Sequence, residues 1–275
     1  MNTTDSTASL SRGQRWLRAL AGDTASSGPV WFADAPLGDE SARFIAVVPD
    51  PDNRFPRARE NVVGLEQGWR LARTVREVVE ADADAPRRRP IVAIVDVKSQ
   101  AYGYREEMLG IHLACAAAID AYASARLAGH PIVALIVGPA MSGAFLAHGY
   151  QANRILALDA PGTMVHAMGK EAAARVTRRC VEALDALAET ITPMSYSLTG
   201  FAKLGLLDQL IERVDADAPT AEQIARVRRI VEEAASSARS GPVDLSRRLE
   251  SDNARTTRAA SIEVRRRMAL QWNAI

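Results

Sequence analysis

The chain has 275 residues, of which 48% are hydrophobic and 24% are charged; this composition is typical of a soluble globular protein with a sizeable core. The net charge of +1 gives no support for a nucleic-acid partner, which would favour a strongly basic chain. The N-terminus is polar and lacks a hydrophobic signal segment, and no apolar run is long enough to span a membrane. We therefore expect a cytoplasmic protein that binds neither nucleic acid nor membrane.

Cysteine and histidine usage bears on metal binding and on disulfides. Cys115 and Cys180 do not form a CxxC pair, and both occur in apolar patterns typical of helices. The pattern favours two buried free thiols. No cluster of potential ligands has the spacing of a zinc site, so we expect no metal.

Hydrophobic periodicity predicts the elements of the first half of the chain. Residues 1–10 are expected to be a disordered tip, residues 12–20 a short docking helix, and residues 21–40 a loop rich in Gly, Pro, Asp and Ser. Near-continuous apolar runs then predict buried strands at 44–48, 91–96 and 132–137. Helices are expected to follow these strands at 62–80, 106–128 and 142–151.

The second half is predicted to be mixed as well. Short strands are expected at 154–158 and 163–166, followed by helices and a return strand: a helix at 170–190, a helix–turn–strand unit at 200–214, and helices at 220–238 and about 244–273. This order indicates a layered α/β fold. In such folds the functional loops lie at the carboxyl ends of the strands.

Residues 138–144 (GPAMSGA) join a predicted strand to a predicted helix. Gly138 and Pro139 are expected to end the strand after Val137, and Gly143 allows a ligand or another backbone to approach closely. The N–H groups at a helix start lack partners within the helix and suit an oxyanion. The spacing alone is equally compatible with a tight turn that serves packing.

A second loop is built in the same way, because it also follows a buried strand and precedes a helix. Ser99, Gln100 and Ala101 are candidates to present N–H groups, and Gly103 permits an unusual backbone angle. The alternative is an ordinary strand–helix loop. Two such loops on consecutive strands favour a site that holds a thioester carbonyl between them.

Several segments, in the same order and spacing, resemble the carboxyltransferase branch of the crotonase superfamily: IVAIVD, QAYG, REE, LAGHPIVALIVGPAMSGAFLAHG, RILALDAPGTMVHAMGKEAA and AKLGLLDQLIERV. Within this branch the chain is most similar to the gamma subunits of biotin-independent malonate decarboxylases. That similarity extends over nearly the whole chain, through SRGQRWLRAL, SQAYGYREE, GPAMSGAFLAHGYQANRI and VHAMGKEAAARVT.

The resemblance implies a fold and an assembly. We expect a crotonase-like ββα superhelix at 41–240, between an N-terminal arm with a docking helix at 1–40 and a C-terminal helix at 241–275. A homologous beta subunit would share the catalytic site in a heterodimer or higher heteromer. An acyl carrier subunit and an acyl carrier transferase subunit are the further partners that the resemblance implies.

The resemblance also implies an activity, the decarboxylation of a malonyl thioester to an acetyl thioester. This chain is expected to bind no cofactor, since the malonyl group is carried on a phosphopantetheine-type prosthetic group of the carrier subunit. The alternatives are a carboxyltransferase subunit of a biotin-dependent carboxylase and a non-catalytic scaffold subunit. Ala140–Ala144 and Lys98-Ser99 replace the Gly-Gly-Ser-Gly-Gly and Pro-Gly of acetyl-CoA carboxylases, which favours the biotin-independent activity.

Loss of CO2 would leave a thioester enolate, and the resemblance assigns roles to the two loops. Backbone amides at Met141, Ser142 and Gly143 would stabilise the enolate or the departing carboxylate, and residues 99–101 would supply the other donor site. Ser142 is expected to act as a donor because no base for a nucleophilic serine can be assigned.

Several other side chains are candidates for a role in the reaction. His166 has an ordinary pKa that suits it to supply or relay a proton to the enolate, although a packed, hydrogen-bonded histidine is the alternative. Tyr102 and Gln100 are candidates to bind the substrate carboxylate, with loop packing as the alternative. Lys170 would attract a carboxylate or phosphate, or be solvated. The remaining histidines are expected to be structural (His112 and His148) or at the surface (His130).

Overall fold

The computed structural model describes residues 10–22 and 28–273, so nearly all of the tip expected at 1–10 lies outside the described residues. The predicted docking helix is confirmed as α1 (Arg12–Ala21). Ser11 begins it through a capping box, in which the Ser11 hydroxyl accepts the Gln14 N–H and the Gln14 side chain accepts the Ser11 N–H. Gly22 ends it with a φ of 79°.

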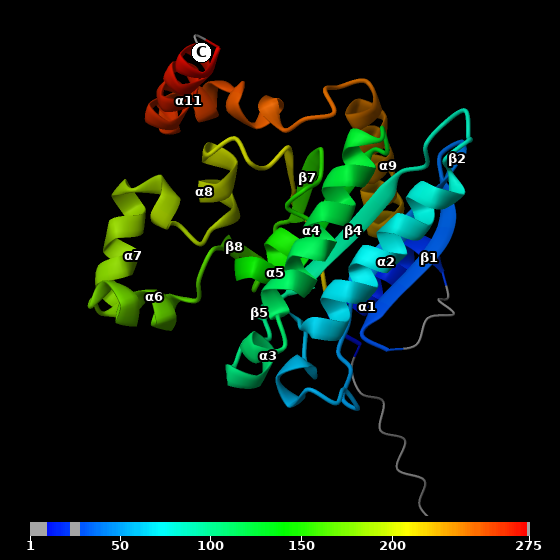
Figure 1. Cartoon of the computed structure of the whole chain (residues 1–275), viewed down its shortest axis with the longest axis horizontal. Coiled ribbons are helices and arrows are strands. Elements are labelled where there is room, and N and C mark those ends of the chain that lie inside the picture. The colour runs from blue at the N-terminus through cyan, green and yellow to red at the C-terminus, as the bar shows by residue number, and fades with distance from the viewer. Residues whose placement is uncertain (1–9, 23–27, 274–275) are drawn as a thin grey trace, which may run out of the picture.

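A seven-stranded sheet forms the centre of the molecule, in the order β1-β2-β4-β6-β7-β9, with β8 paired to β6 (Figure 1). Its strands are β1 (Val30–Leu37), β2 (Glu40–Val47), β4 (Ile91–Val97), β6 (Ile132–Met141), β7 (Arg154–Leu158), β8 (Met164–His166) and β9 (Gln209–Ile211). The β1–β2 pair is antiparallel and the other pairs are parallel. A separate parallel pair joins β3 (Val62–Val63) to β5 (Ser99–Gln100).

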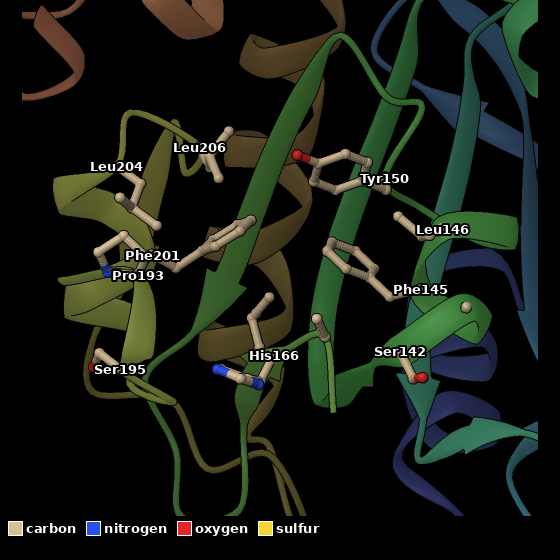
Figure 2. Close-up of a pocket in the computed structure, with 13 residues that line it drawn as sticks. Ser142, Phe145, Leu146, Tyr150, His166, Pro193, Ser195, Phe201, Leu204 and Leu206 are labelled. Atoms are coloured by element: carbon tan, nitrogen blue, oxygen red, sulfur yellow. The ribbon is translucent and has the colours of Figure 1, made fainter. Parts of the chain in front are cut away.

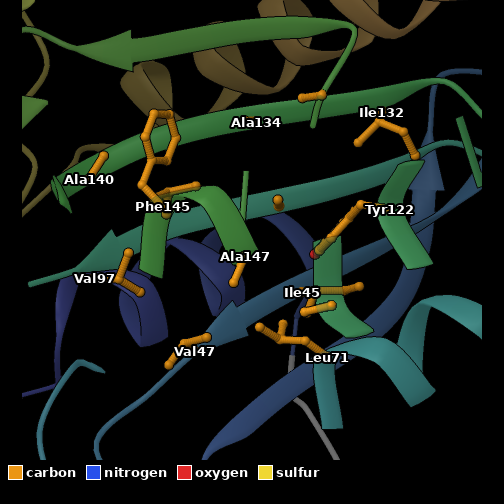
Figure 3. Close-up of a cluster of buried hydrophobic side chains, with 14 of the residues drawn as sticks. Ile45, Val47, Leu71, Val97, Tyr122, Ile132, Ala134, Ala140, Phe145 and Ala147 are labelled. Carbon is orange, nitrogen blue, oxygen red and sulfur yellow. The ribbon is translucent and has the colours of Figure 1, made fainter. Parts of the chain in front are cut away.

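Helices cover both faces of this sheet (Figure 1). One face carries α2 (Leu65–Ala81), α4 (Ile111–Leu127) and α5 (Ser142–Ala147), and Figure 3 shows their side chains meeting those of the strands. The other face carries α1 and α9 (Ala221–Arg239). Because β4 and β6 are buried on both faces, their sequences are continuous apolar runs rather than alternating ones.

The remaining helices are α3 (Tyr104–Met108), between β5 and α4; α6 (Lys170–Thr177), α7 (Val181–Thr190) and α8 (Leu198–Lys203), between β8 and β9; and α10 (Asp252–Thr257) and α11 (Ala259–Trp272), after α9. Three 3-10 turns complete the described chain at Pro56–Ala58, Thr192–Met194 and Ser246–Leu249. In Figure 1 α6 and α7 project to one side of the sheet, and α11 lies apart from it. The mixed α/β architecture predicted from the sequence is confirmed.

Several predicted boundaries were wrong. Residues 30–37 of the loop expected at 21–40 form β1, which pairs with β2 along its whole length. The helix expected at 106–128 is divided at Gly110, whose φ of 81° separates α3 from α4. Arg178 divides the helix expected at 170–190 in the same way, with a φ of 54°. The C-terminal helix expected at about 244–273 is a 3-10 turn followed by α10 and α11.

Buried polar residues and thiols were also predicted with mixed success. His148 is structural as expected: it is fully buried, with Nδ1 3.0 Å from the Tyr122 hydroxyl and Nε2 3.0 Å from the Ile94 carbonyl oxygen. His130 was expected at the surface but is only 1% exposed. Cys115 is partly buried, whereas Cys180 is exposed at the start of α7, so the prediction of two buried thiols was wrong for Cys180.

Candidate active site

The end of β6 places the first candidate loop. The prediction that Gly138 and Pro139 end the strand was wrong, because the last residues of β6 pair with β8 and extend it to Met141. Gly138 is needed for another reason: a Cβ atom there would lie 2.2 Å from an Asp96 carboxylate oxygen. The β6–β8 register sets Met141 opposite His166. Two of the candidate residues are therefore brought together by strand pairing.

The chain turns sharply where β6 meets α5. Ser142 has a φ of 59°, a left-handed conformation that costs a non-glycine residue about 1–3 kcal/mol and is common at functional sites. The Gly143 N–H donates to the side-chain oxygen of Gln100 at 2.9 Å. A Cβ atom on Gly143 would lie 3.1 Å from that oxygen. The strand–helix junction thus aims a backbone donor at an oxygen atom, which is the geometry that oxyanion binding requires.

The second candidate loop reaches this junction through a side chain. Ala101 is 3% exposed, and its N–H donates to the Val63 carbonyl at 2.9 Å. The expectation that Ala101 offers an N–H to a substrate was therefore wrong. The Ser99 hydroxyl donates to the Gln100 carbonyl. The Gln100 side-chain amide is the part of this loop that contacts the β6–α5 junction.

Two cavities flank the junction, and Ser142 lines both. The first, here the apolar cavity, has a volume of about 370 Å³. Figure 2 shows aromatic and aliphatic side chains around most of this cavity, among them Phe145, Leu146, Tyr150, Phe201 and Leu206. Ser142, His166 and Ser195 lie at one end and are polar. The second, here the polar groove, has about 380 Å³ and is lined by Lys98, Ser99, Gln100, Tyr102, Ser142, Met168, Gly169, Ala172, Arg175 and Val176.

His166 lies at the polar end of the apolar cavity. Its Nδ1 atom is 3.0 Å from the Met168 carbonyl oxygen and 3.2 Å from the Met168 amide nitrogen. Its ring stacks on Tyr196, with 3.7 Å between centroids and 12° between planes. Burial lowers the pKa of His166, and the hydrogen bond to Met168 partly offsets that effect. The structure therefore brings Ser142, Gly143 and His166, three of the candidate residues, to one cavity.

Two further predicted residues are placed differently. The Lys170 ammonium pairs with Asp185 at 2.6 Å and lies 5.4 Å from the Tyr196 ring centroid, and Lys170 lines neither cavity. Gly103 has an extended φ of −178°, so the expected unusual backbone angle is not found there. Tyr102 lines the polar groove as an exposed side chain.

Some residues of the cavities were missed by sequence analysis. Arg175 lines the polar groove from α6, and Tyr196 stacks on His166 from the segment that follows the Pro193 turn. A single arginine in a helix carries no distinguishing signal. Tyr196 stands in a run of Ser and Thr after a helix-breaking proline, and that interruption was the one available indication of a functional loop.

Neither a metal site nor a membrane span is found. Across residues 10–22 and 28–273, no three His, Cys, Asp or Glu side chains are grouped to hold a metal ion. In the same part of the chain, no helix has the length and apolar character needed to cross a membrane.

Comparison with known sequences extends over most of the chain. The family model of the malonate decarboxylase gamma subunit matches residues 58–272. The malonyl-S-ACP:biotin-protein carboxyltransferase of Malonomonas rubra is 38% identical over 185 residues, which are 66% of this chain. The match covers 63% of that relative, so the chain spans less than two thirds of its length.

Solved structures show the same relationship. A Pseudomonas malonate decarboxylase hetero-tetramer in complex with coenzyme A contains a chain that is 54% identical, with a TM-score of 0.90 over 95% of this chain and 100% of that one. A Pseudomonas MdcD-MdcE hetero-dimer contains one that is 53% identical with the same coverage and a TM-score of 0.86. Transcarboxylase 12S is 19% identical, with a TM-score of 0.62 over 83% of this chain and 40% of that one.

These matches confirm the predicted crotonase-like carboxyltransferase fold, since transcarboxylase 12S shares it at low sequence identity. The family match includes the candidate loops at 99–103 and 138–144 and the strand that carries His166. By sequence and by structure, the chain belongs to the malonate decarboxylase gamma subunit family.

Proposed function

We propose that this chain is a catalytic subunit in the decarboxylation of a malonyl thioester, in which the Gly143 N–H stabilises the enolate. The observation that carries the proposal is the Gly143 N–H held at 2.9 Å from the Gln100 side-chain oxygen, between an apolar cavity and a polar groove. The thioester oxygen takes the place of that side-chain oxygen when substrate binds. Membership of the gamma subunit family supports the choice of substrate.

The chemistry explains why a backbone donor is useful here. When the bond between the carboxylate and the α-carbon breaks, its electron pair passes to the thioester, and negative charge gathers on the thioester oxygen. A fixed N–H aimed at that oxygen is stronger toward the enolate than toward the neutral thioester. One donor of this kind contributes about 3–4 kcal/mol to the transition state. Ser142 fixes the donor's direction through its left-handed backbone.

The apolar cavity suits the departing CO2. An apolar lining disfavours a carboxylate but tolerates uncharged CO2, so loss of charge into this cavity favours the reaction. His166 lines the same cavity, where it donates the proton that converts the enolate carbon to the acetyl methyl group. The reaction then needs neither a metal nor a covalent intermediate on this chain.

The polar groove suits the arm that carries the acyl group. Lys98 and Arg175 line it, and Arg175 has no ion-pair partner in the described parts of the chain. A phosphopantetheine arm carries a phosphodiester, which Arg175 attracts. Lys98 pairs with Glu60 at 2.8 Å and would have to leave that partner to bind the phosphodiester. Tyr102 and Gln100 line the same groove and hydrogen-bond the arm and the acyl group it presents.

The assembly is proposed on the same basis. A homologous beta subunit completes the site, and an acyl carrier subunit and an acyl carrier transferase subunit deliver and recharge the arm in the cytoplasm. The Pseudomonas MdcD-MdcE hetero-dimer, in which one chain is 53% identical to this one, supports the first of these partners.

The proposal is tested by reconstituting the complex and measuring CO2 release from malonyl carrier, with this subunit present or omitted and with or without avidin. We expect release to require this subunit and to be unaffected by avidin. Inhibition by avidin would instead indicate a biotin-dependent carboxyltransferase, the activity named for the Malonomonas rubra relative. Full release without this subunit would leave it only a scaffold role.

A further inference from the structure

We propose that Tyr196 is a positioning residue that fixes His166 as the proton donor of the apolar cavity. The inference rests on the proposed function, because it concerns the proton that the enolate must receive. It adds a residue from a separate segment, 30 positions further along the chain, whose ring stacks on the imidazole and whose hydroxyl donates to the Met168 carbonyl oxygen beside it.

The first observation is the stacking of the two rings. The Tyr196 and His166 centroids are 3.7 Å apart with 12° between the ring planes, so the imidazole cannot rotate without losing that contact. The face of a phenol ring is negative and attracts a cation placed over it. Stacking therefore orients His166 and also favours its protonated form.

The second observation is that the two residues share one backbone carbonyl. The Tyr196 hydroxyl donates to the Met168 oxygen at 2.6 Å, and Nδ1 of His166 lies 3.0 Å from the same oxygen. In the imidazolium ion the Nδ1–H therefore donates to the Met168 oxygen, and Nδ1 no longer accepts the Met168 N–H that lies 3.2 Å away. Nε2 has no hydrogen-bond partner among the described residues, and its proton is the one free to leave.

Tyr196 is itself held in place by the chain around it. Its carbonyl oxygen accepts the Val165 N–H of β8 at 3.4 Å, which joins it to the strand that carries His166. The Ser195 and Ser197 hydroxyls bond to each other at 2.8 Å. Gly200 leaves room for this turn, because a Cβ atom there would lie 2.5 Å from the Ser195 side chain.

The charged groups around the two stacked rings lie close to the Tyr196 ring. The Lys170 ammonium lies 5.4 Å from the Tyr196 ring centroid and pairs with Asp185 at 2.6 Å. Burial, together with Glu171 and Asp185, raises the pKa of Tyr196, so its hydroxyl remains a donor to Met168 at neutral pH. Lys170, expected from sequence to contact the substrate, instead supports the ring that orients His166.

The proton that the enolate receives comes from Nε2 of His166. The Nε2–H bond of the imidazolium breaks, and its proton forms the new C–H bond at the enolate carbon. The electron pair stays on Nε2, which leaves a neutral imidazole with its remaining proton on Nδ1, bonded to Met168. Water then returns a proton to Nε2.

The kinetic test is the pH profile of CO2 release by the reconstituted complex carrying Tyr196→Phe or Tyr196→Leu. Activity should fall as the pH rises through the pKa of His166. Tyr196→Leu removes the ring and should move this fall to lower pH, with a loss at pH 7.5 of roughly five- to tenfold. Tyr196→Phe keeps the ring and should stay within roughly threefold of wild type. Tyr104→Leu, an exposed tyrosine replaced in the same way, should leave the midpoint unchanged.

A second measurement does not depend on turnover. The chain has four histidines, so NMR titration of the isotope-labelled full chain can follow His166 directly, and the buried His148 reports whether the variant is folded. We expect Tyr196→Leu to lower the measured pKa of His166. An unchanged His166 titration in the folded variant would overturn the inference. Absence of CO2 release from the wild-type complex would instead refute the proposed function.

Discussion

At the scale of single residues, the Gln100 side chain occupies the place that we propose for the enolate oxygen. Its oxygen accepts the Gly143 N–H, so in the proposed mechanism a thioester oxygen displaces the Gln100 oxygen when substrate binds. A neutral amide is a moderate acceptor, whereas an enolate forms a charge-assisted hydrogen bond that is roughly twice as strong. The exchange therefore favours the enolate more than the neutral substrate.

This competition leads to a prediction for Gln100→Glu. A carboxylate would hold the Gly143 N–H more strongly than the amide does and would also repel the enolate. We expect kcat/KM for malonyl carrier to fall by about tenfold or more, equivalent to ~1.4 kcal/mol. The matched variant Gln100→Leu, which has neither charge nor acceptor, should lose clearly less. Equal losses in steady-state assays of the two variants would show that Gln100 does not compete for this donor.

Sequence analysis predicted the residues of the junction better than their hydrogen bonds. GPAMSGA was a candidate anion-binding turn, with a tight packing turn as the equal alternative, because its small residues and strand–helix position leave N–H groups unpaired within the helix. Ala101 was assigned a donor role that it does not have, because the β3–β5 pair that engages its N–H is only two residues long. A pair so short leaves no periodic signal in the sequence.

At the scale of elements, His148 follows α5 and hydrogen-bonds to both α4 and β4 beneath the site. The neutral ring accepts from the Tyr122 hydroxyl and donates to the Ile94 carbonyl, both at 3.0 Å. Burial lowers the pKa of His148 to about 4. A protonated ring would lose the bond from Tyr122 and would be buried as a charge.

The buried, neutral His148 predicts that the free energy of unfolding depends on pH. The ordinary pKa of His148 is near 6.5, so the unfolded chain binds a proton that the folded chain excludes between about pH 6.5 and 4. The free energy of unfolding should therefore be highest above pH 6.5 and fall as the pH approaches 4, by up to roughly 3 kcal/mol. Urea denaturation of wild type and of the double variant Tyr122→Phe/His148→Leu would measure it. An equal decrease in both proteins would contradict the role of His148.

The packing of α2 on α4 gives a second prediction at this scale. A Cβ atom on Gly68 would lie 2.6 Å from the Ala114 carbonyl oxygen, so the two helices meet through this glycine. Gly68→Ala should lower the free energy of unfolding by about 1–3 kcal/mol, although alanine is the better helix former. Gly169→Ala is the matched control, because its Cβ atom would meet nothing closer than 3.9 Å. A neutral result for Gly68→Ala would contradict the close packing.

The strands predicted from continuous apolar runs are buried on both faces, whereas β1, which was missed, is partly exposed. The apolar runs of β4, β6 and β7 identified these strands because both of their faces are buried. β1 was taken for loop because it contains Asp34 and Pro36 and is largely half-exposed, so its pairing with β2 outweighs its composition. The break at Gly110 has a sequence signal, whereas the one at Arg178 places an ordinary arginine in a left-handed conformation.

At the scale of the whole molecule, α1 connects the back of the sheet to the loops of the site. The Gly13 N–H donates to Asp96 at the end of β4, and Arg12 bonds both Asp217 and the Val137 carbonyl. The helix predicted to dock therefore packs on its own chain. The two cavities were not predictable, because each combines side chains from segments that are distant in sequence, such as Phe145 and Phe201 in the apolar cavity.

The central claim is that this chain supplies the Gly143 amide to the enolate. The most direct test is the rate of CO2 release from malonyl carrier by the complex carrying Gly143→Val, whose side chain would crowd the Gln100 oxygen and the position of the enolate. With the complex intact by gel filtration, we predict that kcat falls by about 10²-fold or more. An intact complex with unchanged turnover would contradict the claim.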